Sequence, residues 1–342
     1  NNKNNKESAI VKPYLNQDDK YLTAQGLITT LVELALSRGI ALHKLLRGTG
    51  VFEQDLMSVQ HQFSISQQVR LLTQFKQLMK SADSGFLLGS QLANDTSVAA
   101  QGVLHAAHIG QALKQLHNLR MQLAPLLFSY SYVHNEQYYI VLQNAVGLDD
   151  EISQYVMEIY SAAFYQVLKK VAGERVPCQF EFACKRARHS QEYEQHLGLK
   201  VAFEKPITRW VLNKHALRLT NPAFSSFRFS QINSQLAALD SANSTFVEAV
   251  SRLIYQNPAL NLDQVASQFA MSPATFKRKL KAHGVRFSTL YDEQSKRKAI
   301  YLLAMREQCN EQVAMRLSFY DIANFRRAFK RWTGLTPSQL KG

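Results

Sequence analysis

The apolar positions of this chain follow a helical period through its first 120 residues. Four segments repeat apolar residues at intervals of three and four, and each predicts a helix: residues 27–35, 42–46, 65–79 and 103–119. Arg38-Gly39 and the pair Gly48 and Gly50 are stop signals after the first two segments. Gly110 is expected to break the fourth segment. The chain therefore opens with a helical region.

After residue 125 the apolar pattern changes to the alternation that is typical of β-strands. Residues 126–133 and 137–143 are rich in Tyr, Phe, Val and Ile, and the polar turn His134-Asn135-Glu136 between them predicts a hairpin. Residues 151–171 return to helical spacing. Short strands are expected at residues 178–182, 200–203 and 210–212. We interpret residues 22–225 as one α+β domain, with helices packed on a mostly antiparallel sheet.

One short apolar pattern occurs twice in the last hundred residues, about 48 residues apart. The matched residues are Val265 and Ala266 with Val313 and Ala314, then Phe276 and Arg278 with Phe325 and Arg327. Each copy predicts a short apolar helix, a tight turn and a second helix with an apolar i, i+4 pair. This is the spacing of a helix-turn-helix, in which the first helix braces the second and the second presents its other face to the DNA major groove.

Residues 246–340 resemble the DNA-binding domain of the AraC/XylS family of bacterial transcription regulators. The most specific stretch, Asn324 to Ser338, reads NFRRAFKRWTGLTPS, close to the family signature F-x-R-A-F-K-R-x-x-G-x-T/S-P-S. The first copy fits the family through Met271-Ser272-x-x-Thr275-Phe276-x-Arg278-x-Leu280. The resemblance implies an all-α C-terminal domain with two helix-turn-helix units joined by a long linker helix.

Two positions depart from the family pattern. Ser318-Phe319-Tyr320 stands where the family usually has Gly-Phe-Ser in the second turn, so we expect Ser318 to hold a backbone angle that favours Gly, with roughly 1 kcal/mol of strain. The linker helix commonly carries Arg four residues before a buried Ala. Here Ser295 precedes Ala299, and Lys296 and Arg297 are adjacent.

The predicted recognition helices begin at good N-caps, Ser272 followed by Pro273 and then Asp321 in the second copy. The resemblance implies that the positions matching base contacts are Ala274, Lys277, Arg278, Ala323, Asn324 and Arg327. Lys281, Lys330 and Arg331 are expected to hold phosphates, and Arg326 is a further exposed candidate. The alternative for Arg327 is a structural salt bridge to Glu293 or Glu311.

Residues 287–305 predict one long helix between the two units. At 1.5 Å per residue, ~19 residues span ~28 Å. This length is close to the ~34 Å between successive major-groove faces on one side of the duplex. A rigid spacer of that size would let one monomer read two consecutive turns of DNA.

The N-terminal half resembles the helical-plus-sheet domain of one branch of the same family, often labelled an arabinose-binding type. The matching positions are Leu42-x-x-Leu45-Leu46-Arg47-x-x-Gly50, then Gly102-Val103-Leu104 leading to Leu113, and residues 180–203. We divide the chain into a disordered tail at residues 1–21, a sensor domain at residues 22–225, a linker at residues 226–243 and a DNA-binding domain at residues 244–342.

Positive charge is concentrated in the region of the repeat. Residues 244–342 hold 16 Lys and Arg against 7 Asp and Glu, a net charge of +9, whereas residues 1–243 hold 24 against 19, a net charge of +5. Contact with phosphates and release of counterions need a positive potential of this kind. The distribution of charge therefore favours DNA contact by the repeat.

Composition also limits the class of protein. Its 342 residues suit two or three domains, and the chain has no run of 18 apolar residues and no signal-peptide pattern. The three cysteines, Cys178, Cys184 and Cys309, give neither a disulfide framework nor a zinc spacing. We therefore expect a cytoplasmic protein without a cofactor or a metal. No phosphate-binding Gly-rich loop, His-Glu-x-x-His or nucleophile elbow is found that would indicate an enzyme.

Three weaker candidate sites remain in the N-terminal half. His105 and His108 could share a helix face and bind a metal, but without a third ligand they are expected at the edge of the core. Pro177-Cys178 resembles the Pro-Cys-His-Arg of DNA-repair alkyltransferases but lacks the His. The hairpin aromatics Phe128, Tyr130 and Tyr132 share one face of a strand, which could be core or could line a ligand pocket.

We interpret the chain as a sequence-specific transcription regulator that binds double-stranded promoter DNA. The expected partners are a small-molecule effector, RNA polymerase and a second copy of the chain in a homodimer, with no membrane. Activation is the commoner outcome in the family, and repression is the alternative. The rival hypotheses are a DNA-localised enzyme with a catalytic N-terminal domain and a non-specific architectural DNA-binding protein.

Overall fold

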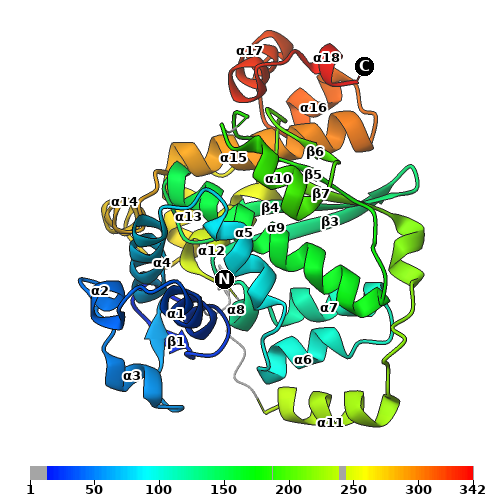
Figure 1. Cartoon of the computed structure of the whole chain (residues 1–342). Helices are drawn as coiled ribbons and strands as arrows, with labels where there is room; N and C mark the ends of the chain where they lie inside the picture. The colour runs from blue at the N-terminus through cyan, green and yellow to red at the C-terminus, as the bar shows by residue number, and fades with distance from the viewer. Residues whose placement is uncertain (1–13, 187, 239–243, 342) are drawn as a thin grey trace, which may run out of the picture. The chain divides into compact units, whose positions relative to one another are not determined.

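Separate hydrophobic cores define two units in the chain, whose computed structural model describes residues 14–186, 188–238 and 244–341. Residues 16–238 form the N-terminal domain. Residues 244–341 form the C-terminal domain together with residues 14 and 15 (Figure 1). The expected α+β domain followed by an all-α domain is confirmed.

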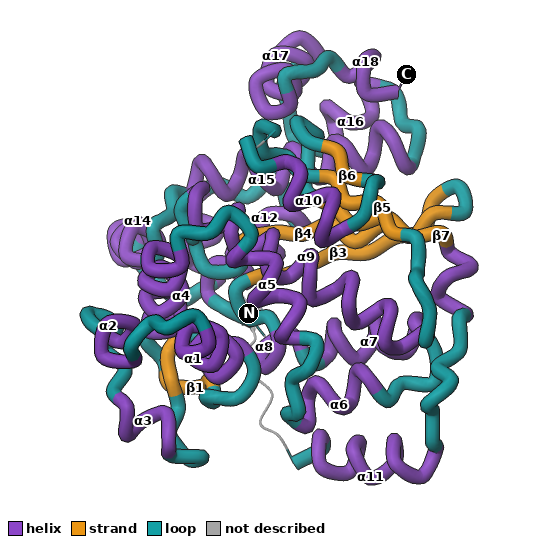
Figure 2. Tube along the Cα trace, viewed as in Figure 1, coloured by secondary structure: helices purple, strands orange, loops and turns teal. Residues whose placement is uncertain are grey.

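A five-stranded sheet lies at the centre of the N-terminal domain (Figure 2). Its strands follow the order β3 (Leu127–His134), β4 (Gln137–Asn144), β7 (Arg209–Asn213), β5 (Cys178–Glu181) and β6 (Val201–Ala202). Neighbouring strands are antiparallel except β5 and β6, which are parallel. The mostly antiparallel sheet expected from the sequence is therefore present.

The predicted hairpin is β3 and β4, but its turn is shorter than expected. His134 belongs to β3 and pairs with Gln137, so only Asn135 and Glu136 form the turn. Both have positive φ, 44° and 64°. A two-residue turn with both central residues at positive φ matches the right-handed twist of the two strands.

The helices of the N-terminal domain cover this sheet and a small second sheet of β1 (Lys20–Leu22) and β2 (Phe63–Ser64). They are α1 (Leu27–Ser37), α2 (Leu42–Leu46), α3 (Glu53–Met57), α4 (Ile65–Met79), α5 (Ser84–Leu92), α6 (Val98–Leu104), α7 (Ile109–Asn118), α8 (Arg120–Leu123), α9 (Asp150–Ala172), α10 (Ser190–Leu197) and α11 (Ser226–Leu236), with a 3₁₀ turn at Lys214–Arg218.

The longest helix, α9, begins and ends at residues suited to those places. The side chain of Asp149 accepts a hydrogen bond from the Ile152 N–H at 2.9 Å, and Gly173 ends the helix with φ of 70°. Helix α5 packs closely on α9 at Gly89. A Cβ at Gly89 would lie 1.9 Å from the carbonyl oxygen of Ile159, so only Gly allows the two backbones to approach this far.

Three sequence-based expectations are corrected by this domain. The break expected at Gly110 falls earlier, because α6 ends at Leu104 and His108 caps α7 by accepting from the Gln111 N–H. The expected linker at residues 226–243 contains helix α11, whose Asn233 accepts a hydrogen bond from Gln115 of α7. Ile232 is buried on the same helix, so the N-terminal domain extends past residue 225. Residues 239–243 lie outside the described residues.

The expected disordered tail at residues 1–21 is wrong for residues 14–21. Residues 1–13 lie outside the described part of the chain. Lys20–Leu22 is strand β1, where Leu22 is buried. Leu15 donates a backbone hydrogen bond to Ser244 and accepts one from Phe246, each at 2.9 Å. These contacts hold residues 15–22 in the fold. The polar composition of the segment alone does not separate such residues from a disordered tail.

The C-terminal domain is all-helical, as expected. Its helices are α12 (Phe246–Gln256), α13 (Leu262–Gln268), α14 (Pro273–Ala282), α15 (Phe287–Ile300), α16 (Asn310–Arg316), α17 (Ile322–Thr333) and α18 (Pro337–Lys341). The predicted long helix over residues 287–305 is present, but its last five residues, Tyr301–Met305, are wound as a π-helix. A π-turn inside a helix often marks a functional site.

Candidate nucleic-acid interface and ligand cavity

The first helix-turn-helix consists of α13 and α14, and both helices begin at capped positions. Asn261 accepts from the Gln264 N–H at 2.9 Å, which starts α13. Ser272 accepts from the Thr275 N–H at 3.2 Å, and Pro273 is the first residue of α14. The predicted N-cap and first-turn proline are confirmed, so the sequence sets where the first recognition helix begins.

The second helix-turn-helix consists of α16 and α17. Asp321 caps α17, because its Oδ1 accepts from the Asn324 N–H at 2.6 Å. The helix ends at Gly334, which has φ of 73°. The predicted cap is confirmed, and its carboxylate also places a negative charge at the positive end of the helix dipole.

Each turn between the paired helices contains one residue in the left-handed conformation. Ser318 has φ of 60°, as predicted from its place opposite the Gly of the family. Ala270, which matches Ser318 in the first unit, has φ of 54°. Both side chains are exposed, so the strain is not offset by burial of a side chain.

The two recognition helices bury one face and expose the other. Phe276 and Leu280 of α14 are 0 % and 1 % exposed, and Phe325 and Phe329 of α17 are both 0 % exposed. The residues predicted to contact DNA lie off these buried faces. Asn324 is half-buried, and the exposed members are Ala274, Lys277, Arg278, Lys281, Ala323, Arg326, Arg327, Lys330 and Arg331.

Three polar side chains form a chain of hydrogen bonds along the first turn of α17. Asn324 donates from Nδ2 to Oδ2 of Asp321 at 2.7 Å, and its Oδ1 accepts from Nη2 of Arg327 at 2.5 Å. The cap therefore orients the amide of Asn324, and the amide in turn orients the guanidinium of Arg327. Pre-oriented donors lose less side-chain entropy when they bind.

The salt bridge of Arg327 to Glu293 considered from the sequence is not formed, because Glu293 pairs with Lys296 at 3.2 Å. A different ion pair lies nearby. Arg331 lies 3.2 Å from Asp292 of α15, and both side chains are largely exposed. Arg327 instead donates to Asn324. An exposed ion pair contributes little to stability, so the contact with Asp292 does not prevent Arg331 from exchanging its partner for a phosphate.

Two basic residues have structural positions within the C-terminal domain. Nζ of Lys279 lies 4.7 Å from the ring centroids of both Tyr14 and Phe246 and donates to the Tyr14 hydroxyl at 3.1 Å. The guanidinium carbon of Arg297 lies 3.5 Å from the ring centroid of Tyr255, and Arg297 is buried. These two positive charges face rings of the domain core, whereas Arg278 and Arg327 are exposed to solvent.

Tyr320 is a candidate contact that the sequence reasoning missed. Its side chain is 98 % exposed and immediately precedes the cap of α17. The signal was available in the sequence, because Tyr320 replaces the small Ser of the family at a turn that faces the recognition helix.

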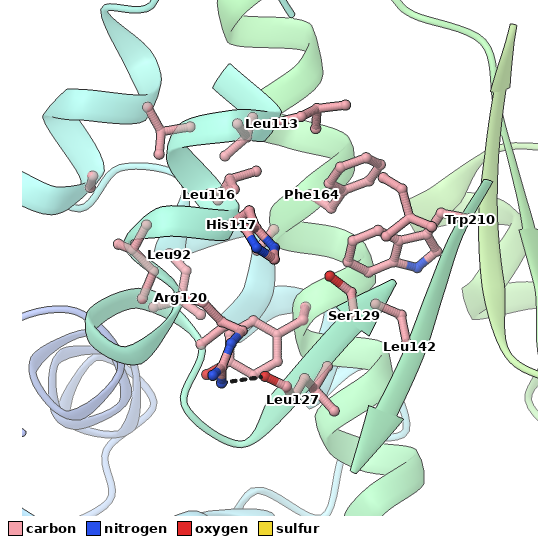
Figure 3. A pocket seen from close by; sticks show the side chains of 18 of the residues that line it. Leu92, Leu113, Leu116, His117, Arg120, Leu127, Ser129, Leu142, Phe164 and Trp210 are labelled. Carbon is pink, nitrogen blue, oxygen red and sulfur yellow. Dashed lines mark hydrogen bonds between the residues drawn. The ribbon is translucent and has the colours of Figure 1, made fainter. Parts of the chain in front are cut away.

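A cavity of about 170 Å³ lies inside the N-terminal domain (Figure 3). Its walls come from β3, β4 and β7 on one side and from helices α6 to α9 on the other. The lining residues include Leu113, Leu116, His117, Arg120, Leu127, Ser129, Ser131, Tyr138, Ile140, Leu142, Tyr160, Phe164 and Trp210.

The strand register decides which hairpin residues reach this cavity. Ser129 pairs with Leu142, and Ser131 pairs with Ile140, which in turn pairs with Trp210 of β7. Because side chains alternate along a strand, these residues share the face that lines the cavity. Because Ser129 and Ser131 of β3 are small, they leave room for the cavity. The larger side chains of Leu142 and Ile140 form the wall beside them.

Of the three hairpin aromatics predicted as ligand residues, only Phe128 lines the cavity. Tyr132 stacks on Tyr139 with ring centroids 5.2 Å apart, and Tyr130 packs edge-on against Phe128 at 5.5 Å. Tyr130 and Tyr132 alternate with the serines that line it. Periodicity identified two faces of the strand, but it did not indicate which face the helices leave open.

Two polar groups are buried in the wall of the cavity. Arg120 is 8 % exposed and donates from Nη1 to the Leu127 carbonyl at 3.1 Å (Figure 3). The hydroxyl of Tyr160 is buried without a hydrogen-bond partner among the described residues. Burial raises the pKa of the Tyr160 hydroxyl well above its usual range, so the group stays protonated and can donate.

His105 and His108 do not share a helix face as considered from the sequence. Nε2 of His105 lies 2.9 Å from Oε1 of Gln101, and His108 caps α7. Burial lowers the pKa of His105, with a smaller contribution from Arg228. Their contacts are those of structural residues between two helices.

The cysteines of β5 and the following loop lack the character of nucleophiles. Burial raises the pKa of the Cys178 thiol far above its ordinary value and raises that of Cys184 to about 11. A nucleophilic cysteine needs a lowered pKa, because the thiolate is the reactive form. The environment of Cys178 therefore disfavours the alkyltransferase-type reaction, in agreement with the missing His.

One group of possible metal ligands was not seen in the sequence. Asp83, Glu192 and His196 bring ligand atoms within 4.8 Å of one another in the N-terminal domain. The ring of His196 stacks on Phe86, with centroids 5.2 Å apart. Glu192 and His196 lie one turn apart on α10, whereas Asp83 precedes α5 and is remote in sequence, so the spacing along the chain does not indicate the third residue.

Within the described ranges, no helix combines the length and the apolar character needed to cross a membrane.

Comparison with known families matches both domains. Residues 39–221 match the family described as the arabinose-binding domain of AraC transcription regulators, N-terminal. Residues 265–342 match a helix-turn-helix domain. The first match covers more than half of the chain, and the second covers both helix-turn-helix units except the first three residues of α13.

Individual relatives are similar over different lengths. An ornithine utilization regulator of Pseudomonas aeruginosa is 29 % identical over 190 residues, which are 54 % of each chain. The transcriptional regulator VqsM of the same species is 21 % identical over 280 residues, 76 % of this chain and 84 % of its own. The chain spans about half the length of the first of these relatives.

Among solved structures, the transcriptional regulator CdpR from Pseudomonas aeruginosa is 18 % identical with a TM-score of 0.42, covering 92 % of this chain and 96 % of its own.

Proposed function

The chain belongs to the AraC family of transcription regulators, and from that premise we propose that it binds promoter DNA in a sequence-specific way under the control of its N-terminal domain. One observation carries the proposal. Two helix-turn-helix units in one domain have capped recognition helices that bury their aromatic faces and expose basic ones.

In this proposal α14 and α17 enter two successive major grooves on one side of the duplex. The helical segment between the units, α15 with its π-turn, runs over residues 287–305. A segment of ~19 residues is ~28 Å long at the α-helical rise, close to the ~34 Å separation of successive grooves. One monomer would then cover a site of roughly 17 to 20 base pairs.

The exposed residues have different roles in this complex. The candidate base-reading residues are Ala274, Lys277, Arg278, Ala323, Asn324 and Arg327. Arg recognises guanine through O6 and N7, and Asn recognises adenine through N6 and N7. The residues assigned to phosphates are Lys281, Arg326, Lys330 and Arg331, which fix the register without reading sequence.

We propose that control comes from a small molecule in the cavity of the N-terminal domain or from self-association of that domain as a homodimer. A ligand that binds a domain with different affinity in two states shifts the balance between them. Activation through contact with RNA polymerase in the bacterial cytoplasm is the outcome we favour over repression.

The experiment that tests this function begins with selection of bound fragments from the source genome. The affinity of the full chain is then measured for a selected duplex and for its scrambled counterpart at one salt concentration. We expect the selected duplex to bind at least ~10³-fold more tightly. Equal affinities would support a non-specific architectural protein instead.

Two further measurements separate the remaining alternatives. The fragment of residues 240–342 should bind the selected duplex as a monomer, because its helices carry both units and the excess of charge. A folded fragment without DNA affinity at low salt would contradict the domain assignment. Recovery of a cavity ligand unchanged after incubation would argue against a catalytic N-terminal domain.

A further inference from the structure

We propose that the cavity of the N-terminal domain binds a small organic monocarboxylate with a compact apolar body. Its carboxylate is recognised by the guanidinium of Arg120 and the hydroxyl of Tyr160, and its body lies between the sheet and helices α7 to α9. The inference rests on the proposed function in one respect, namely that this ligand is the effector. Binding itself can be measured without DNA.

The walls of the cavity select the body of the ligand. Most of the lining is aliphatic or aromatic, with Leu113 and Phe164 from helices α7 and α9 and with Leu142 and Trp210 from the sheet (Figure 3). Phe164 and Trp210 stack with centroids 4.1 Å apart, and the indole N–H already donates to Ser161. One face of each ring therefore packs on the other, and the two rings offer a ligand apolar contact without a hydrogen-bond donor.

The size of the cavity limits the ligand to a small molecule. Its volume is about 170 Å³, and a protein cavity of ~150 Å³ lined by apolar side chains holds benzene. One ring or a short aliphatic chain with one acidic group fits this space. A sugar does not suit it, despite the label of the domain family, because each hydroxyl facing an apolar wall would lose its hydrogen bonds with water.

Arg120 supplies the charge. Its side chain is buried in the wall and donates to the Leu127 carbonyl. A guanidinium carries five N–H donors in all. Its charge lies beside an apolar space, where attraction to an anion is stronger than in water. A guanidinium also matches a carboxylate in shape, since both are planar and can form two parallel hydrogen bonds.

Tyr160 supplies a neutral donor. Tyr160 lines the cavity, and its hydroxyl is buried and has no hydrogen-bond partner within the described ranges. A buried hydroxyl without a partner is uncommon in folded proteins and is satisfied when a ligand oxygen accepts from it. Tyr160 lies on α9 and Arg120 lies on α8, so the two proposed donors come from separate helices.

The acidic residue of the cavity is already engaged. Asp95 accepts hydrogen bonds from the Ser97 N–H at 3.0 Å and from the Ser97 hydroxyl at 2.6 Å. Ser97 is the N-cap of α6, so Asp95 has a structural position at the start of that helix. His117 lies at an exposed part of the lining. A zwitterionic amino acid would use Asp95 for its ammonium group, which the test below distinguishes.

The test measures binding of phenylacetate and hexanoate to the full chain by titration calorimetry, with phenylacetamide and hexanamide as neutral counterparts. We expect at least one carboxylate to bind, and to bind ~10-fold or more tightly than its amide. Phenylalanine and L-arabinose complete the series. Binding of phenylalanine alone, of arabinose alone, or of amide and acid equally would overturn the proposal, as would failure of both carboxylates at millimolar concentration.

Two substitutions locate the site. Tyr160→Phe removes only the unpartnered hydroxyl, and we expect it to weaken carboxylate binding several-fold. Tyr165→Phe is the matched control on the same helix, since Tyr165 does not line the cavity, and it should leave binding unchanged. Arg120→Gln should remove the preference for acid over amide. If Arg120→Gln does not fold, the comparison of acid with amide on the unaltered chain and the two tyrosine variants still decide the question.

The outcome separates this inference from the proposed function. Sequence-specific DNA binding without carboxylate binding would refute the ligand class and leave the regulator intact. Carboxylate binding that follows the expected variants, without sequence-specific DNA binding, would leave the ligand class intact and refute the proposed function.

Discussion

Ala270 and Ser318 occupy the same place in the two helix-turn-helix turns, and both hold a left-handed backbone, with φ of 54° and 60°. Gly adopts this conformation without the steric cost that a Cβ brings. The two units therefore share the local geometry of the turn although neither has the Gly that suits it.

The first prediction follows from this strain. Ser318→Gly and Ala270→Gly should each raise the free energy of unfolding by roughly 0.5–1 kcal/mol, because relief of the left-handed strain exceeds the added freedom of the unfolded chain. Urea unfolding of the full chain measures the change. Ala282→Gly, at an exposed position without a positive φ, is the control and should lower stability. A loss of stability in all three variants would show that the turns are not strained.

The second prediction separates base reading from phosphate contact. Arg327→Ala should cost ~1–3 kcal/mol of binding free energy on the selected duplex and relax discrimination at one base pair. Lys281→Ala should weaken binding to all sequences about equally and reduce the salt slope by roughly 1. Fluorescence titrations at several salt concentrations measure both effects, with unfolding midpoints as the control. Equal weakening of selected and scrambled DNA by Arg327→Ala would refute its base-reading role.

The third prediction concerns the exposed aromatic before α17. Tyr320→Ala should weaken binding to the selected duplex by roughly 1–3 kcal/mol, since a large side chain that is 98 % exposed in the free protein would be buried on DNA. The unfolding midpoint should stay unchanged, because Tyr320 contributes little to the core. Unaltered DNA affinity would place Tyr320 outside the interface.

The degree to which the sequence predicts this molecule differs between its two domains. In the C-terminal domain the N-caps at Ser272 and Asp321 and the buried Phe276 and Phe325 are local signals, so the recognition helices could be placed with their exposed faces. The strain at Ser318 was also predictable, since it depends on one residue in one turn.

The N-terminal cavity could not be placed in this way. Strand alternation separates Ser129 and Ser131 from Tyr130 and Tyr132, but the face that lines a cavity depends on which helices cover the sheet. Arg120 of α8 and Tyr160 of α9 line one cavity only through the tertiary fold, which no local pattern specifies. The place of Tyr14 in the C-terminal domain is a further case, because it depends on contacts with Lys279 and Phe246, which are far from it in the sequence.

The fourth prediction is a pH dependence in the N-terminal domain. Burial raises the pKa of the Glu158 carboxyl above its ordinary value of 4.5, while the hydrogen bond from Tyr193 opposes part of this effect. A carboxyl with a raised pKa in the folded state favours folding when protonated. That contribution is complete below pH 4.5 and is lost as the pH rises through the folded pKa.

Glu158→Gln removes this titration while keeping the shape of the side chain. The free energy of unfolding of the natural chain minus that of the variant should therefore fall as the pH rises above 4.5 and through the folded pKa of Glu158. Urea unfolding of both chains at matched pH measures the difference, in which titrating groups remote from Glu158 cancel. A difference that rises with pH would show that the folded state favours the ionised carboxyl.

The spacing of the two half-sites tests the central claim most directly. If α14 and α17 read two successive major grooves from one side of the duplex, insertion of about five base pairs between the half-sites turns one groove to the opposite side, since a turn contains ~10.5 base pairs. The affinity of the full chain for the selected duplex and for this insertion variant is measured at one salt concentration. We expect the affinity for the insertion variant to be at least ~100-fold lower than that for the selected duplex, close to the value for scrambled DNA. Equal affinity for the two duplexes would contradict the claim that both units read one site.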